Sequence, residues 1–410
     1  MNSNPTQPST PHVWIIVLIA SLGYFIDIYD LVIFSIVRIE SFKDIGIAEI
    51  NMRTDGQYVL NMQMGGLLIG GVLWGVIGDK LGRLKVLFGS IILYSIANFA
   101  NGFVQDIHSY ALIRFIAGIG LAGELGAGVT IVSESMSKDK RGYGTMIIAA
   151  IGVLGALAAF YISEIFHWRN AFFIGGGMGI LLLFLRIGTF ESGMFQQSLK
   201  INMKRGSLNM LFNNKERLSR FVFVLLIGLP IWFIVGILIT QAPEFGKALG
   251  APEVLSAGKG IMFTYIGISI GDIFAGLFAQ LTKSRRLTVF VFQILILISS
   301  VWYLSSTGIT SGKFMWLAFF MGFGVGYWAT FVTIASEQFG TNLRATVTTT
   351  APNFVRGALI PSTLLFQFFV DLYGLINAAY IMVFLLSGIA IFALSRLKES
   401  FSKDLNYIEE

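Results

Sequence analysis

The sequence predicts an all-α polytopic membrane protein, in which twelve transmembrane helices form two pseudo-symmetric bundles of six. Three observations lead to this fold class. Hydrophobic residues make up 55% of the 410 residues and charged residues only 13%, against roughly 25% charged in an ordinary soluble domain. Long apolar runs recur along the whole chain, and a motif of the first half returns in the second half.

The apolar runs give twelve windows of about 20 residues, each long enough to cross a ~30 Å hydrocarbon core as a helix. The predicted spans are 12–37, 57–78, 84–104, 109–135, 143–163, 168–188, 219–241, 256–282, 287–306, 313–338, 342–371 and 375–397. Residues 1–11 are polar and lack the basic region of a signal peptide, so we expect the first span to remain as an anchor.

A short charged turn, Gly75 to Lys85, joins the second and third spans and forces two helices to meet closely. Its pattern G-x-x-x-D-K-x-G-R resembles the cytoplasmic loop signature of the major facilitator superfamily, which consists of secondary transporters with twelve helices. The resemblance implies that the fold is that of this superfamily, and it extends over nearly the whole chain.

Basic residues predict the topology, because cytoplasmic loops collect Lys and Arg. With the N-terminus inside, the inner segments hold Lys80, Arg83, Lys85, Lys138, Lys140, Arg141, the stretch from Lys200 to Arg220, Lys283, Arg285, Arg286, Arg344, Arg396, Lys398 and Lys403. We therefore expect a multi-pass protein of the cell inner (cytoplasmic) membrane with both termini cytoplasmic. The net charge of +6 reflects this insertion rule, and no nucleic-acid partner is expected.

A polar segment between the sixth and seventh spans predicts a division into an N-terminal bundle (1–188), a cytoplasmic linker (189–218) and a C-terminal bundle (219–410). A repeat supports two related halves. The motif V-T-I-x-S-E at 129–134 recurs at 332–337, and an Arg follows each Glu by seven residues. The same offset aligns Gly123 with Gly326, although the charged loop signature is degenerate in the second half.

Several function classes are disfavoured by composition. The chain has no Cys and only three His, which are far apart, so disulfides and thiolate metal sites are excluded and no metal or cofactor is expected. An enzyme would need a clustered nucleophile and base or metal ligands. A receptor would need a soluble output domain. We expect neither, and no catalytic residues.

Ionisable residues far from the helix ends are the functional candidates, because burying charge in lipid is costly. Asp27 and Asp30 lie three residues apart on one face of the first span and cannot both ionise cheaply, so a single proton shared between them is expected. Such a pair suits proton coupling. The alternative is that a base holds one or both ionised and merely locks helices together.

Two motifs connect these acids to known families. D-I-Y-D at 27–30 resembles the first-helix element of the metabolite:proton symporters, whose relatives transport aromatic acids, sialate and phosphate. The run from Arg114 to Glu124 resembles the fourth-helix signature R-x-x-x-G-x-G-x-G-[GE] of the superfamily. The resemblance implies that Arg114 approaches Asp30 and alternates with the proton. Glu124 follows the organic-ion branch, and the alternative for it is a clamp between helices.

Arg356 in the eleventh span is the candidate anchor for a substrate carboxylate or phosphate, because nothing in its own helix neutralises it. The region from Ser336 to Gly357 is similar to that of organic anion transporters, in which an eleventh-helix Arg accompanies anionic substrates. A permanent pair with Asp272 is the alternative. Asp272 itself is assigned as a second protonation site or as part of helix packing.

The remaining candidates line the expected cavity or its rim. The substrate-binding candidates beside Arg356 are Asn353, Gln63, Tyr24, Tyr327 and Trp328, with Asn98, Trp232 and Tyr265 as further cavity candidates. At the cytoplasmic rim we expect inter-helix ion pairs that hold one gate state closed, formed by Asp79, Arg83, Glu134, Arg141, Glu337 and Arg344.

The function that these features favour is proton-coupled uptake of a small organic anion, a carboxylate metabolite, by alternating access. We expect a monomer in the lipid bilayer whose partners are the anion and protons. Efflux and inorganic phosphate:proton symport are the alternatives. Against efflux, the fifth span lacks the Gly-Pro pair of antiporters; against phosphate, Glu124-Leu-Gly stands where that branch usually has Asp-Tyr-Pro.

Overall fold

The computed structural model describes residues 10–81, 83–124, 141–190 and 208–401. This described part is helical, and the predicted fold class is confirmed. The elements of the first half are α1 (Thr10–Asp44), η1 (Glu49–Asn51), α2 (Met52–Leu81), α3 (Arg83–Asn101), α4 (Ile107–Leu121), α6 (Arg141–Ile165) and α7 (Trp168–Phe190).

The second half is longer and more broken. Its elements are α9 (Leu208–Phe212), α10 (Lys215–Phe233), the π-helical η2 (Ile234–Ile239), α11 (Ala242–Ala248), α12 (Ala257–Thr282), α13 (Arg285–Leu304), α14 (Ser311–Val325), α15 (Trp328–Glu337), α16 (Thr341–Gly357), α17 (Leu359–Tyr373) and α18 (Leu375–Arg396). Eleven of the predicted spans coincide with a helix or with two consecutive helical segments of this order, and the fourth, 109–135, begins with α4 and continues beyond residue 124 outside the described residues. The part of the predicted linker that is described holds α9 and the start of α10.

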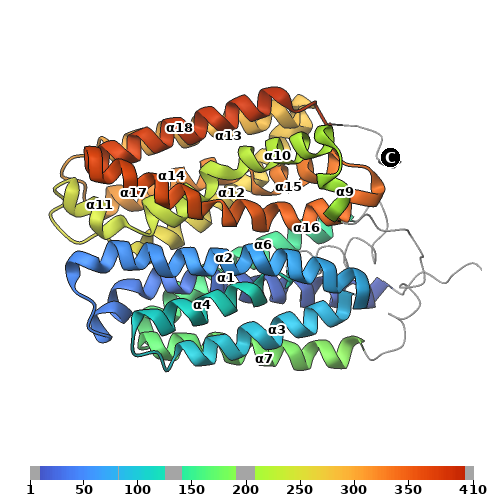
Figure 1. Ribbon diagram of the computed structural model, residues 1–410, viewed down its shortest axis with the longest axis horizontal. Helices are drawn as coiled ribbons and strands as arrows, with labels where there is room; N and C mark the ends of the chain where they lie inside the picture. The colour runs from blue at the N-terminus through green and yellow to red at the C-terminus, as the bar shows by residue number, and fades with distance from the viewer. Residues whose placement is uncertain (1–9, 82, 125–140, 191–207, 402–410) are drawn as a thin grey trace, which may run out of the picture.

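Two layers run parallel to the long axis in Figure 1: α1 to α7 (blue to green) lie below, and α10 to α18 (yellow to red) lie above. Between the layers, α2 packs against α16 and α17, and α12 packs against α1 and α6. The interface is therefore formed mainly by α1, α2 and α6 on one side and by α12, α16 and α17 on the other. Any path through the molecule between the halves runs along these helices.

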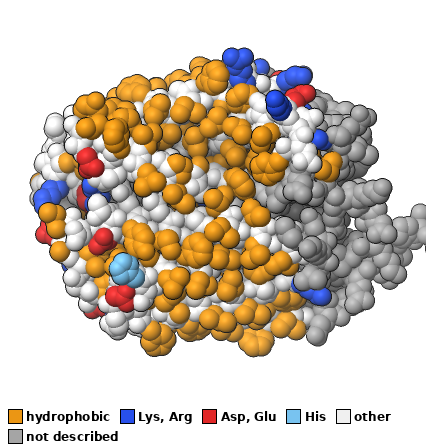
Figure 2. Space-filling view, in the orientation of Figure 1, with side chains coloured by type: hydrophobic (Ala, Val, Ile, Leu, Met, Phe, Trp, Pro, Cys, Tyr) orange, Lys and Arg blue, Asp and Glu red, His pale blue; other side chains and the backbone are white. Residues whose placement is uncertain are grey.

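The surface explains how the bundle sits in a membrane. Figure 2 shows hydrophobic side chains covering the middle of the visible face, with charged side chains gathered toward the two ends of the long axis. Eight of the described helical spans are long and apolar enough to cross a bilayer by length and composition. Large exposed side chains such as Phe184 (65%) and Trp316 (62%) are accounted for by contact with lipid.

Glycines permit a close contact at a break in the tenth span. The α14 helix ends at Val325 and α15 begins at Trp328, with Gly326 as the C-cap of α14. A Cβ at Gly271 of α12 would meet the carbonyl oxygen of Phe323 and would lie 3.0 Å from the Gly326 Cα. The repeat is visible here, because α4 also ends, at Leu121, just before the aligned Gly123.

We predict that Gly271→Ala destabilises the protein by about 1–3 kcal/mol, because overpacking against backbone forces helices apart. The unfolding midpoint in detergent measures this. Gly276→Ala is the matched control on the same helix, since a Cβ at Gly276 would have nothing within 4 Å. Equal midpoints for the two variants would show that α12 and α14 do not need this contact.

Candidate functional site

The first acid of interest, Asp30 on α1, is held by Arg114 on α4. Arg114 Nη1 donates to Asp30 Oδ1 at 2.9 Å and to Asn98 Oδ1 at 3.2 Å, and Nη2 donates to the Asp30 carbonyl at 2.7 Å. Both side chains are fully buried, and the Phe172 ring lies 5.4 Å from the guanidinium carbon. The contact that the resemblance implies is present, while its part in proton coupling stays a prediction.

Asp27 lies one turn earlier on α1 in a different charge environment. Its side chain is 2% exposed, and Oδ1 has no hydrogen-bond partner among the described residues. The charged groups that influence it come from both halves of the chain and include Arg356, Glu124 and Asp30. Within the described part of the chain, Asp30 thus has an ion-pair partner, whereas Asp27 has none.

Arg356 on α16 is buried, with 2% of its surface exposed. Its guanidinium carbon lies 5.6 Å from the ring centroid of Trp232 and 5.8 Å from that of Trp328. Nη1 donates a long hydrogen bond of 3.4 Å to Asn353 Oδ1, and Nε has no partner. Within the described part of the chain no carboxylate forms an ion pair with this group, and the alternative pairing with Asp272 is not formed.

Asp272 instead caps a helix. Its Oδ1 accepts a hydrogen bond of 2.8 Å from the backbone N–H of Ala329, in the first turn of α15. An acid at a helix N-terminus satisfies a free N–H group and interacts favourably with the helix dipole. This contact supports the packing alternative for Asp272, and the protonation role stays a prediction.

Glu124 is paired with an arginine that sequence reasoning missed. Arg186 of α7 donates from Nη1 to Glu124 Oε2 at 3.0 Å and from Nη2 to Oε1, and both side chains are buried. Gly23 of α1 lies against this pair, because a Cβ there would collide with both side chains. The arrangement is a clamp between helices. Arg186 lies close to the end of the predicted span 168–188, so the rule that selects charges far from the helix ends passes over it, and only the observed helix, which continues to Phe190, places it inside.

Among the other candidates, those near Arg356 are Tyr24 and Trp328, which lie against each other. Asn353 bridges the halves, since its Nδ2 donates to the Ala122 carbonyl at 3.2 Å. Gln63 Nε2 donates to the Leu31 carbonyl at 3.2 Å. Tyr327 is committed elsewhere, because its hydroxyl donates to the Ile227 carbonyl and accepts from Gln293 Nε2, both at 2.7 Å.

The predicted gating residues are only partly visible. Glu134 lies outside the described residues, as do the side chains of Asp79, Arg83, Arg141 and Arg344. Glu337 is described, and it contacts Arg285 at 3.5 Å and accepts from Ser400 Oγ at 2.7 Å. Its described partners therefore belong to the second half of the chain.

Nearby, Glu399 follows the end of α18 and holds the start of α13. It accepts hydrogen bonds from Ser284 Oγ at 2.5 Å and from the Arg285 N–H at 2.9 Å. Although partial burial favours its neutral form, these bonds and those from other backbone N–H groups hold the pKa of Glu399 below its ordinary value. This carboxylate stays ionised and keeps the two helix ends together.

The opposite end of the bundle, which holds α11, is closed by a second missed pair. Arg38 of α1 is 1% exposed and donates to both carboxylate oxygens of Glu244 on α11, at 2.7 and 2.8 Å. It also donates to the carbonyls of Met52 at 2.8 Å and Thr240 at 3.1 Å. Further polar contacts between the halves here are Asn61 with Thr363, Arg53 with Gln367 and Lys247 with Glu49.

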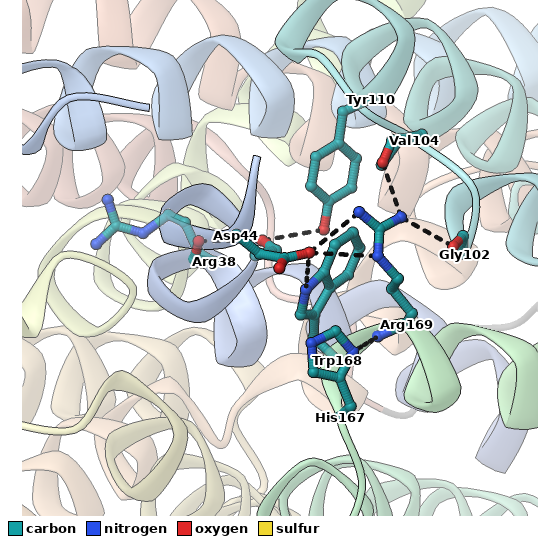
Figure 3. Close-up of polar contacts among 9 residues, drawn as sticks. Arg38, Asp44, Gly102, Val104, Tyr110, His167, Trp168 and Arg169 are labelled. Atoms are coloured by element: carbon teal, nitrogen blue, oxygen red, sulfur yellow. Dashed lines mark hydrogen bonds and ion pairs between the residues drawn. The ribbon is translucent and has the colours of Figure 1, made fainter. Parts of the chain in front are cut away.

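The end of α1 is tied to its own half by a separate cluster, drawn in Figure 3. Asp44 Oδ2 accepts from Trp168 Nε1 at 3.1 Å and from Arg169 Nη2 at 3.1 Å. Arg169 Nη1 also holds the Gly102 and Val104 carbonyls at 3.1 and 2.8 Å. In Figure 3, the Arg38 guanidinium points away from this cluster. The helix is thus fixed to its own half at Asp44 while Arg38 reaches across to the other.

Layered long helices with an apolar belt define a multi-pass membrane protein. The chain belongs to the Major Facilitator Superfamily, whose sequence profile matches residues 13–361. The predicted resemblance to this superfamily is confirmed.

Relatives and solved structures agree with this assignment. NiaP of Bacillus subtilis, named for niacin/nicotinamide transport, is 25% identical over 363 residues, which cover 84% of this chain and 87% of that protein. The sialic acid transporter NanX of Escherichia coli is 29% identical over 268 residues, 62% of this chain and 64% of that one. The structure of the proton:xylose symporter XylE superposes with a TM-score of 0.68 at 17% identity, covering 97% of this chain and 98% of that one, which shows the fold.

The clamp assignment for Glu124 is testable by stability. We predict that Arg186→Met costs about 3–5 kcal/mol, because it leaves the Glu124 carboxylate buried without a partner. The double variant Arg186→Met with Glu124→Leu is expected to recover most of that loss, since two apolar side chains replace the pair. Unfolding midpoints in detergent measure both. A double variant that is stable yet inactive would place Glu124 in the transport path instead.

Proposed function

We propose that this transporter is a proton-coupled symporter of a small organic anion, with Arg356 as the group that binds the substrate carboxylate. The observation that carries the proposal is a buried guanidinium with no carboxylate partner among the described residues. A buried charge without a counter-charge is strongly unfavourable. An anionic substrate supplies that counter-charge, and the planar guanidinium can bind a carboxylate through two parallel hydrogen bonds.

Proton coupling follows from the position of Asp27. Arg356 interacts with Asp27 electrostatically, so ionised Asp27 and the substrate carboxylate compete for one cation. When the substrate occupies Arg356, a second negative charge nearby becomes costly, and Asp27 takes up a proton. Substrate and proton are then bound together, which is what symport requires. Asp30, with Arg114 as its own partner, forms the second acid–base pair of the site.

The relatives support an organic carboxylate over inorganic phosphate. NiaP is named for niacin and its neutral amide nicotinamide, and NanX for sialic acid; niacin and sialic acid carry a carboxylate at neutral pH. The N–H donors of the Arg356 guanidinium match one carboxylate group, and they therefore suit such an anion. Drug or metabolite efflux is the alternative, and the buried positive charge of Arg356 favours an anion over the cationic or neutral compounds of a drug exporter.

The transport cycle is alternating access between two states. We place the protein in the cytoplasmic membrane as a monomer with both termini inside, so that the α11 end faces outward. The contacts at that end, above all Arg38 with Glu244, hold it closed. For substrate to enter from outside these contacts break, while the Asp44 cluster keeps α1 attached to its own half.

We predict that proteoliposomes accumulate a labelled carboxylate such as nicotinate or sialate when the outside is made acidic. Arg356→Ala is expected to lower uptake at least tenfold, because a charge-assisted bond worth about 1.5–3 kcal/mol is lost. Asp27→Asn is expected to abolish gradient-driven accumulation while exchange of substrate across the membrane persists. The measurement is uptake of each labelled compound with and without the gradient.

Arg396→Ala is the matched control, since this exposed arginine at the end of α18 lies far along the chain from the buried acids of the site. Normal uptake by Arg356→Ala would refute the anchor role. If an imposed gradient never drives accumulation of any carboxylate, proton symport is wrong.

We also predict that Arg38→Ala and Glu244→Gln open the α11 end. The chain contains no Cys, so spin labels at Phe103→Cys and Val254→Cys, which are 69% and 81% exposed, report the distance between the halves without background. Pulsed electron spin resonance is expected to show longer distances in both variants. Lys247→Ala is the control, because its pair with Glu49 is more than 80% exposed and worth little. If all three variants lengthened the distance equally, burial of the Arg38–Glu244 pair would not be what keeps the α11 end closed.

A further inference from the structure

The surroundings of Arg356 are aromatic. Trp232 comes from α10, Trp328 from α15, Tyr24 from α1 and Tyr265 from α12, so four helices of both halves contribute one ring each. Trp232 and Tyr265 are buried, whereas Tyr24 and Trp328 keep part of their surface accessible. Such a set of rings beside a cation attracts it through the ring faces.

Two buried donors in this group lack acceptors. Among the described residues, neither Trp232 Nε1 nor Arg356 Nε has a hydrogen-bond partner, although both side chains are more than nine-tenths buried. Unpartnered buried donors are costly and rare in folded proteins. An unpartnered Nε is shared by Arg38, Arg114 and Arg186 and does not distinguish Arg356. The Trp232 indole N–H does distinguish this site, and its ring centroid lies 5.6 Å from the Arg356 guanidinium carbon, so both can donate to one anionic ligand.

Two candidate polar groups that could bind hydroxyls, Asn353 and Tyr327, are already in use. Asn353 donates to the carbonyls of Ala122 and Thr349 and accepts from Arg356. Tyr327 is bonded to Ile227 and Gln293. A ligand with many hydroxyl groups would therefore find neither of these side chains available, whereas the rings beside Arg356 favour an apolar ligand body.

We propose that the substrate is a flat aromatic monocarboxylate. Its carboxylate binds Arg356 and the Trp232 N–H, and its ring stacks among the indoles and Tyr24. Trp232 and Trp328 are then the residues that determine specificity. This inference rests on the proposed function, because it takes Arg356 as the carboxylate anchor. It adds that the part of the substrate beyond the carboxylate is a flat aromatic ring.

The test compares four probes that differ in one property at a time. Purified protein in detergent is titrated by calorimetry with benzoate, cyclohexanecarboxylate, gluconate and benzamide. Cyclohexanecarboxylate has the size and charge of benzoate without the flat ring, gluconate is a polyhydroxylated carboxylate, and benzamide keeps the ring without the charge. We expect benzoate to bind roughly 3- to 10-fold more tightly than cyclohexanecarboxylate, because contacts between aromatic rings add a favourable free energy of this size. Gluconate and benzamide are expected to bind more weakly still.

Variants of the two tryptophans test whether their rings cause the preference for benzoate. Trp328→Leu is expected to remove the advantage of benzoate over cyclohexanecarboxylate, while Trp328→Phe and Trp232→Phe retain part of it and guard against loss of folding. Trp316→Leu is the matched control, because this tryptophan is 62% exposed on the outer surface of α14 and its loss is expected to change neither affinity.

The outcomes separate the two proposals. If gluconate or cyclohexanecarboxylate binds as tightly as benzoate, or Trp328→Leu weakens both ring compounds equally, the aromatic inference is overturned while the carboxylate site survives. If benzamide binds as well as benzoate and no carboxylate depends on Arg356, the proposed function fails and this inference fails with it.

Discussion

The cost of burying charge inside a membrane protein organises this structure. Four arginines, Arg38, Arg114, Arg186 and Arg356, are at most 2% exposed. The first three are each satisfied by a carboxylate on another helix, namely Glu244, Asp30 and Glu124. Each pair fastens helices that lie far apart in the sequence, since removing either partner leaves a buried charge unpaired. Arg356 departs from this pattern, and the same physics that makes the others structural makes it a binding group.

The first helix distributes these contacts. Asp27, Asp30, Arg38 and Asp44 all lie on α1 and face, in turn, the aromatic centre, α4, α11 and the start of α7. The contacts of Asp30 and Asp44 lie within the first half of the chain, so they are compatible with this half moving as a rigid body. The other two reach Arg356 and Glu244 in the second half. A rocking motion of the halves would therefore leave Asp30 and Asp44 undisturbed while changing the surroundings of Asp27 and Arg38.

Much of the fold could be predicted from the sequence, because apolar runs of membrane length carry a strong local signal. Each of the twelve predicted spans contains a described helix, although α1 extends to Asp44 instead of residue 37. The shorter span places Arg38 in a loop and so conceals it. Breaks at Gly326 and after Gly357 are not predicted either. They depend on contacts between helices, such as Asp272 at the start of α15, that no local pattern records.

The site shows the same limit of local reasoning. The unusual charges Asp27, Asp30 and Arg356 can be singled out one at a time, because each is costly in lipid on its own. Their partners are harder to find. Arg114 and Asp30 lie 84 positions apart in the sequence, and only the family resemblance implies their contact. Arg38 and Glu244 lie 206 positions apart, and no sequence pattern indicates that they meet.

Spacing on α1 suggests that Asp27 and Asp30 share a proton, and this stays a prediction. In the described part of the structure Asp30 forms an ion pair with Arg114, whereas Asp27 forms none and interacts electrostatically with Arg356. This non-local fact changes which acid communicates with a substrate. If the substrate carboxylate and ionised Asp27 each interact with Arg356, binding of the substrate alters the free energy of protonating Asp27. By thermodynamic reciprocity, protonation alters substrate affinity by the same factor. No mechanical relay between distant sites is needed, because the coupling free energy resides in one guanidinium. The Asp30–Arg114 pair, with its own counter-charge and additional bonds to Asn98 and the backbone, is insulated from that competition and keeps α1 and α4 together while it occurs.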